Sequence, residues 1–198
     1  MNVAIFEVCR NPEIRKQTET LMLSQAFERL GISCQVYSND GIWDRRTFLN
    51  RSLLQKCLGD ESVDVVHLAL HGDRDGLVLG WSKAEKIRDR RPQDRLSPQD
   101  ITQMSQWRGK LVVSGAASVY PLADAFLNAG ASGVVVPERS ISYQHLVPFL
   151  EILYSKLANR QTPRNSLDNA IRQFPDLDSF RFLSSGSSAS SGIARGRT

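Results

Sequence analysis

The sequence has few cysteines, no long hydrophobic run and no export pattern, and each shortage excludes a class of protein. Cys9, Cys34 and Cys57 are odd in number and lack CxxC or His/Cys ligand spacing, which argues against a disulfide framework and a zinc site. No apolar run approaches the roughly 20 residues that cross a bilayer, and the opening MNVAIFEV does not resemble a signal peptide. We therefore expect a cytoplasmic protein with reduced thiols, no membrane partner, no metal and no cofactor.

An excess of charge of one sign is also lacking, because the net charge is only +4 in 198 residues. Much of it comes from residues 83–95, which hold six basic side chains against three acidic ones. This stretch has no interleaved aromatic residues, so we interpret it as a solvated loop and expect no nucleic-acid partner. The chain also lacks a GxGxxG or P-loop pattern, which argues against a nucleotide-binding domain.

Apolar runs and amphipathic stretches alternate along residues 1–183, and a tail rich in Ser and Gly follows at 184–198. We predict strands at 2–8, 32–37, 63–70, 110–114 and 132–136, an edge strand at 180–183, and helices at 11–30, 46–58, 97–107, 120–129, 143–158 and 163–174. The glycine-bounded run at 76–80 predicts a small β-excursion outside the main sheet. This alternation predicts a three-layer α/β sandwich, whose mainly parallel sheet has about five to six strands with helices on both faces.

Two of the predicted strands end at residues suited to chemistry. The strand at 63–70 leads into His71 and Gly72, and the strand at 110–114 leads into Gly115 and Ala116. Ligand sites of parallel sheets lie beyond the carboxyl ends of the central strands. A cysteine at position 116, at the start of a helix and across from a histidine, would be favoured as a thiolate. The sequence therefore predicts a site at this edge, with alanine where such a nucleophile would stand.

Several motifs, in their order and spacing, resemble those of CHAT domains, which are grouped with the caspase-like cysteine peptidases of clan CD. The motifs are VDVVHLALHG, GLVLG, LSPQDI, WRGKLVVSGAAS and LADAFLNAGASGVVV. In that family a histidine stands before glycine at a strand end, matching His71 and Gly72. The cysteine follows a small pair, matching Ser114 and Gly115, and this places it at Ala116. The two positions are 45 residues apart, close to the roughly 50 found in caspases.

The resemblance implies a cysteine endopeptidase that cleaves a protein substrate. His71 would be its catalytic histidine, position 116 its nucleophile, and the N–H groups of Gly72 and Ala116 its oxyanion hole. Because a methyl group cannot form an acyl-enzyme, we expect the chain as written to be inactive. Two explanations of Ala116 remain open. The chain is either a catalytic mutant of a working peptidase or a natural pseudopeptidase that uses the cleft to hold a peptide or partner.

The same resemblance implies a role in bacterial defence or cell death, with a gasdermin-like partner as substrate and a regulatory or sensor subunit on another chain. It also nominates substrate-binding residues near the end of the first strand and in the loop after 132–136, namely Glu7, Arg10, Glu138 and Tyr143. An acidic lining would favour Arg or Lys before the scissile bond, and a basic lining would favour Asp. The sequence does not choose between them. We interpret His67, inside the strand at 63–70, as a structural residue.

Overall fold

The fold is built on a six-stranded sheet, seen in a computed structural model that describes residues 1–8, 19–38, 49–81 and 92–185. The strands run in the order β2–β1–β3–β7–β8–β9. Their bounds are β1 Asn2–Glu7, β2 Ser33–Ser38, β3 Val65–Ala69, β7 Leu111–Val113, β8 Gly133–Pro137 and β9 Phe180–Leu183. All neighbours pair in parallel except β9, which runs antiparallel to β8 at the edge. The predicted mainly parallel sheet is confirmed.

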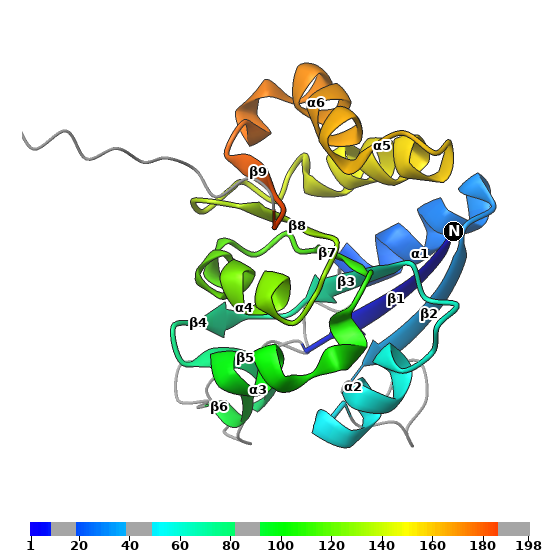
Figure 1. The fold of residues 1–198 in the computed structure, drawn as a ribbon. Coiled ribbons are helices and arrows are strands. Elements are labelled where there is room, and N and C mark those ends of the chain that lie inside the picture. Colours follow the sequence, from blue (N-terminus) through cyan, green and yellow to red (C-terminus); the bar gives the residue numbers. More distant parts are fainter. Residues whose placement is uncertain (9–18, 39–48, 82–91, 186–198) are drawn as a thin grey trace, which may run out of the picture.

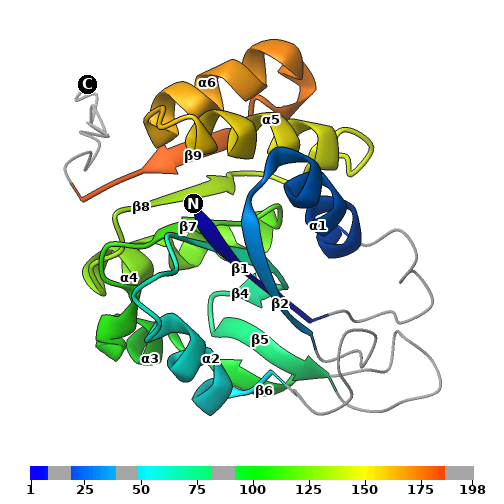
Figure 2. The same ribbon diagram turned by 90° about the vertical axis from the view of Figure 1, so that its right-hand side faces the viewer.

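Helices cover both faces of this sheet, as Figures 1 and 2 show. One face carries α1 (Glu19–Leu30), α5 (Leu146–Ala158) and α6 (Pro163–Gln173), and the other carries α2 (Arg51–Leu58), α3 (Pro98–Gln103) and α4 (Ala123–Asn128). Three short 3-10 helices complete the described helices: η3 (Ser105–Trp107), η4 (Ala117–Leu122) and η5 (Pro175–Leu177). The molecule is therefore the three-layer α/β sandwich that the sequence predicts.

Alternating residues of the central strands feed two separate cores. In β1, Ala4 and Phe6 pack with the α2, α3 and α4 layer, whereas Val3 and Ile5 pack with the α1, α5 and α6 layer. Because successive strand side chains point to opposite faces, a strand covered on both sides is apolar almost throughout. The exception is His67, which β3 places on the α1 and α5 face, fully buried.

The helices α2 and α5 begin later than predicted, for local reasons. The α2 helix starts at Arg51, because the Asn50 side chain accepts a hydrogen bond from the Leu53 N–H at 2.9 Å and caps it. The α5 helix starts at Leu146, which leaves Pro148 in the first turn, where its missing N–H costs no helical hydrogen bond. The part of the predicted α1 helix before Glu19 lies outside the described residues, as does the tail beyond residue 185.

A second, antiparallel sheet lies beside the main one. It contains β4 (Gly72–Asp73), β5 (Gly76–Trp81) and β6 (Pro92–Leu96), in that order. The predicted β-excursion is confirmed, but the interpretation of all of 83–95 as a loop is wrong, since Pro92–Leu96 pairs with β5. Arg95 of β6 binds the Asp73 carboxylate, and this hydrogen bond lowers the pKa of Asp73. A charged side chain on an edge strand is therefore compatible with the sheet.

The turn between β4 and β5 depends on glycine. Gly76 has φ +136°, and a Cβ there would overlap the backbone carbonyl of Leu96. We predict that Gly76→Ala lowers the free energy of unfolding by about 3 kcal/mol, because the substitution adds a backbone clash to a disfavoured φ. Urea unfolding followed by circular dichroism measures this loss.

Gly31→Ala is the matched control, since Gly31 also has positive φ (+65°) but open space around a Cβ. It should cost only about 1 kcal/mol. Equal losses for the two variants would show that the clash with Leu96 is relieved by a small shift of β6.

Candidate active site

The carboxyl ends of β3 and β7 lie side by side. Their parallel register pairs His67 with Val113. One residue further along, the Ser114 hydroxyl donates a hydrogen bond to the Leu68 carbonyl at 2.8 Å and so extends the contact between the two strands. His71 follows the end of β3 and is exposed, whereas Ala116 follows the end of β7 and is half-buried. The two residues singled out from the sequence therefore lie beyond the ends of neighbouring central strands.

Ser114 holds the turn after β7 in place. Its hydroxyl is fully buried, donates to the Leu68 carbonyl and accepts from the N–H of Ala116 at 3.2 Å. The Ser114 N–H donates to the Val135 carbonyl of β8 at 2.9 Å. The Ser114 hydroxyl thereby gives a hydrogen-bond partner to one backbone carbonyl and one backbone N–H, groups that are costly to bury without a partner. The small pair before position 116 therefore has a structural role of its own.

Gly72 is tied to the element that follows Ala116. Its N–H donates to the Ser118 hydroxyl at 3.2 Å, and the preceding His71 carbonyl accepts from the Val78 N–H at 2.8 Å. A Cβ at Gly72 would lie 3.1 Å from Leu122 Cδ1 and 3.2 Å from the Ser118 carbonyl oxygen. The turn that carries the histidine therefore packs directly on η4, at a distance that suits glycine.

The two N–H groups expected to form an oxyanion hole both have partners in this structure. The Gly72 N–H donates to Ser118, and the Ala116 N–H donates to Ser114. The regular α-helix expected to follow Ala116 also begins later than predicted. Ala116 caps the 3-10 helix η4, and the regular helix α4 begins only at Ala123. A short 3-10 helix offers less of the dipole that was expected to favour a thiolate.

Of the four predicted substrate-binding residues, the structure describes Glu7, Glu138 and Tyr143, which lie in three different segments. Glu7 ends β1 and is buried, and the Ser38 hydroxyl donates to its Oε2 at 3.1 Å. Glu138 follows β8 and is bound by Arg181 of β9 at 2.9 Å. Tyr143 is largely exposed, and Arg10 lies outside the described residues. The Glu138 charge is therefore already balanced by a neighbouring strand.

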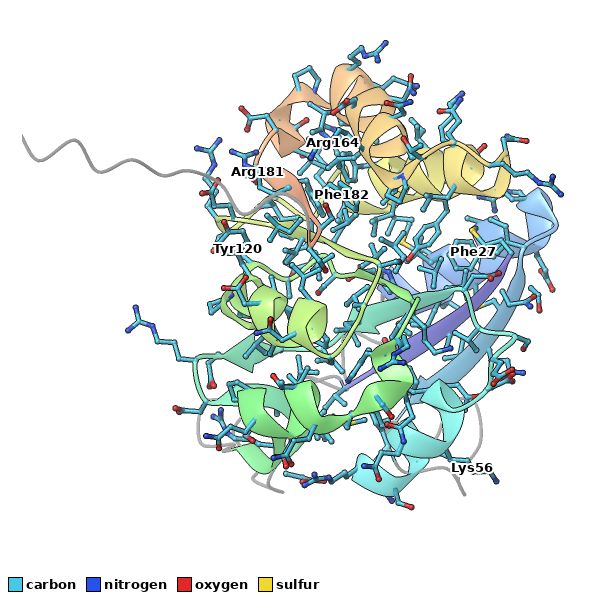
Figure 3. All side chains as sticks on the ribbon, viewed as in Figure 1. Phe27, Lys56, Tyr120, Arg164, Arg181 and Phe182 are labelled. Carbon is cyan, nitrogen blue, oxygen red and sulfur yellow. The ribbon has the colours of Figure 1, made fainter. Side chains whose placement is uncertain are left out.

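A buried polar cluster that the sequence did not predict lies on the α1 and α5 side of this edge. His67 Nδ1 is 2.8 Å from the Tyr154 hydroxyl, and His67 Nε2 is 2.9 Å from Glu19 Oε1. Phe27, labelled in Figure 3, packs edge-on against the Tyr154 ring with centroids 4.7 Å apart. His67 is structural, as expected, but its partners come from residues 48 and 87 positions away. The one available signal was a histidine inside an apolar strand, which needs polar partners when buried.

Neither described cysteine offers a substitute nucleophile. Burial raises the pKa of the Cys34 thiol to about 12 and also raises the pKa of the Cys57 thiol, so both remain protonated near neutral pH. Within residues 1–8, 19–38, 49–81 and 92–185, no group of three or more His, Cys, Asp or Glu side chains is arranged to hold a metal ion. No helix in the same ranges is long and apolar enough to cross a membrane.

Comparison with solved structures finds loose similarity to pyridoxal kinase from Staphylococcus aureus. The complex with AMP-PCP and pyridoxal has 9% identity and a TM-score of 0.40, covering 85% of this chain and 84% of the kinase. The complex with ADP has 11% identity and a TM-score of 0.39 over the same shares. Superposition at this level does not establish a common fold, so nothing about the kinase applies to this chain.

Sequence comparison is more informative. No curated protein matches the chain significantly. The family model of the CHAT domain, however, matches residues 44–181, a range that includes β3, the turn at His71 and Gly72, β7 and Ala116. Because this match covers well over half of the sequence, the chain belongs to the CHAT domain family.

Proposed function

We propose that the edge formed by β3 and β7 is the active site of a caspase-like cysteine peptidase in which alanine occupies the nucleophile position. The observation that carries this proposal is the placement of His71 and Ala116 beyond the ends of two adjacent parallel strands. Membership of the CHAT family supports it, since that family is peptidase-like. The natural substrate would be a protein in the cytoplasm, in a bacterial defence or cell-death pathway.

The proposed chemistry needs a sulfur atom at position 116. A thiolate there attacks the scissile carbonyl carbon, and the carbonyl oxygen takes the negative charge. His71 donates a proton to the leaving amine as the C–N bond breaks, and an acyl-enzyme remains. His71 then takes a proton from water, whose oxygen attacks the acyl carbon and releases the carboxylate and the thiolate. Ala116 removes the first step, so this chain binds substrate without cleaving it.

A second candidate function uses the same cleft without chemistry. A natural pseudopeptidase would hold a peptide or partner there, either a gasdermin-like protein or a sensor subunit on another chain. The observation that favours it is the same alanine, together with the engagement of both predicted oxyanion donors by serine hydroxyls. The two functions differ in whether a thiol placed at position 116 becomes activated.

We predict that Ala116→Cys creates a reactive thiolate that depends on His71. An unperturbed cysteine has a pKa near 8.5, and a neighbouring imidazolium lowers it. Alkylation by iodoacetamide, followed by mass spectrometry, should therefore proceed at the introduced thiol below pH 7. The double variant Ala116→Cys/His71→Ala should react only as pH approaches the pKa of a free thiol.

Peptidase activity is measured on the same pair of variants with a fluorogenic peptide library. Removal of a catalytic nucleophile costs on the order of a million-fold in turnover, so Ala116→Cys should raise cleavage by several orders of magnitude. Cleavage that persists without His71 would contradict the proposed dyad. Absence of cleavage, together with alkylation of the introduced thiol at an equal rate with and without His71, would favour the binding module.

The hydrogen bond from the Gly72 N–H to the Ser118 hydroxyl leads to a further prediction. If the Gly72 N–H stabilises the oxyanion, it must leave the Ser118 hydroxyl when substrate binds. A hydrogen bond of this kind contributes about 1 kcal/mol, so Ser118→Ala in the Ala116→Cys chain should raise kcat/KM by up to about fivefold. A fall in kcat/KM would show instead that the hydroxyl is needed to hold the histidine turn against η4.

A further inference from the structure

The partly buried carboxylate of Glu19 lies against the backbone next to position 116. Its Oε1 and Oε2 are 2.9 Å and 3.3 Å from the point where a Cβ of Gly115 would stand. Its side chain is only 15% exposed. Because the first turn of α1 begins at Glu19, the carboxylate reaches the carboxyl edge of the sheet rather than its middle. An anionic group therefore lies one residue from the proposed nucleophile position.

The Glu19 carboxylate is hydrogen-bonded through Oε1 to the buried His67. Burial keeps the Tyr154 hydroxyl protonated by raising its pKa far above the usual value, so that hydroxyl can donate to His67 Nδ1. We assign the remaining proton of the ring to Nε2, which then donates to Glu19 Oε1. Among the described residues, Glu19 has no cationic partner other than this histidine.

The surroundings of Glu19 suit a long basic side chain. Leu146 Cδ2 lies 2.7 Å from the same Cβ position of Gly115, and the Leu146 N–H donates to the Tyr143 carbonyl at 3.3 Å. Tyr143 is 62% exposed, and the Glu19 charge adds to partial burial in raising the pKa of its phenol. The exposed aromatic ring of Tyr143 can pack on the methylene stem of Lys or Arg and on its cationic head.

We propose that Glu19 is the specificity-determining residue of the site and selects Lys or Arg at the substrate position before the scissile bond, with Tyr143 beside it. This inference rests on the proposed function for the identity of that position. A carboxylate partly removed from water is stabilised by a nearby cation, and a substrate Lys or Arg supplies that cation beside the Glu19–His67 hydrogen bond. Glu19 thereby takes the role predicted for Glu7, whose carboxylate is more deeply buried and bound by Ser38.

The first test needs no catalysis and uses the chain as it stands, with Ala116. The 15N-labelled protein is titrated with N-acetyl-arginine amide and with N-acetyl-citrulline amide, which has the same shape without the charge. Arginine amide should bind at least about tenfold more tightly, the effect of one charge-assisted hydrogen bond, and should shift the amide signals of Gly115 and Tyr143. Equal affinities for the two probes would overturn the proposal.

Three variants assign the preference to Glu19. Glu19→Gln keeps an acceptor for His67 but removes the charge, and should abolish the preference for arginine amide while leaving citrulline amide unchanged. Glu19→Asp keeps the charge and should retain the preference. Glu28→Gln changes an exposed carboxylate on the same helix and should behave as the unmodified chain. A preference for arginine amide that survives in folded Glu19→Gln would overturn the assignment.

Cleavage by the Ala116→Cys chain separates this inference from the proposed function. Histidine-dependent cleavage restricted to Lys and Arg, and lost in Glu19→Gln, supports both. Cleavage without preference for a basic residue overturns the role of Glu19 but still supports the proposed peptidase activity. A preference for arginine amide without any cleavage supports Glu19 in a binding site and counts against the peptidase.

Discussion

The parallel pairing of β3 with β7 is the constraint on which the candidate site depends. In a parallel pair both carboxyl ends reach the same edge, so the turns that carry His71 and Ala116 are neighbours whatever their side chains are. The buried Ser114 hydroxyl extends this pairing by one residue through its bond to the Leu68 carbonyl. The Gly72 N–H then joins the histidine turn to η4 through Ser118. Backbone pairing and two serine hydroxyls therefore bring the two turns together.

The two faces of the sheet contribute differently to this edge. The face covered by α2, α3 and α4 is apolar, and Ala116 packs against that core. The opposite face contains the Glu19, His67 and Tyr154 cluster, whose burial would be costly without its hydrogen bonds. The cluster extends from His67, in the middle of β3, to the Glu19 carboxylate, which lies against the Gly115 backbone. Among the described residues, the Glu19 carboxylate therefore approaches the site from the layer of α1 and α5.

Most of the architecture could be predicted from the sequence, because strand and helix periodicity, glycines and capping residues act locally. The strand Pro92–Leu96 was missed because its proline and charges are atypical of strands, and only pairing with β5 makes it one. The placement of His71 and Ala116 followed from strand order alone. Glu19 was not found, since its contacts with His67 and Gly115 join segments far apart in the chain. Long-range side-chain contacts of this kind leave no periodic signal in a single sequence.

The alanine at position 116 affects chemistry and structure to different degrees. Its side chain is half-buried at the rim of the α2, α3 and α4 core, so a single added sulfur atom has access to solvent and need not displace buried neighbours. The hydrogen bonds that shape the turn come from the Ala116 N–H, from Ser114 and from Ser118, and none involves the side chain at 116. The fold therefore has no structural need for either residue type at this position. A cysteine in place of this alanine would add one sulfur atom without changing these hydrogen bonds.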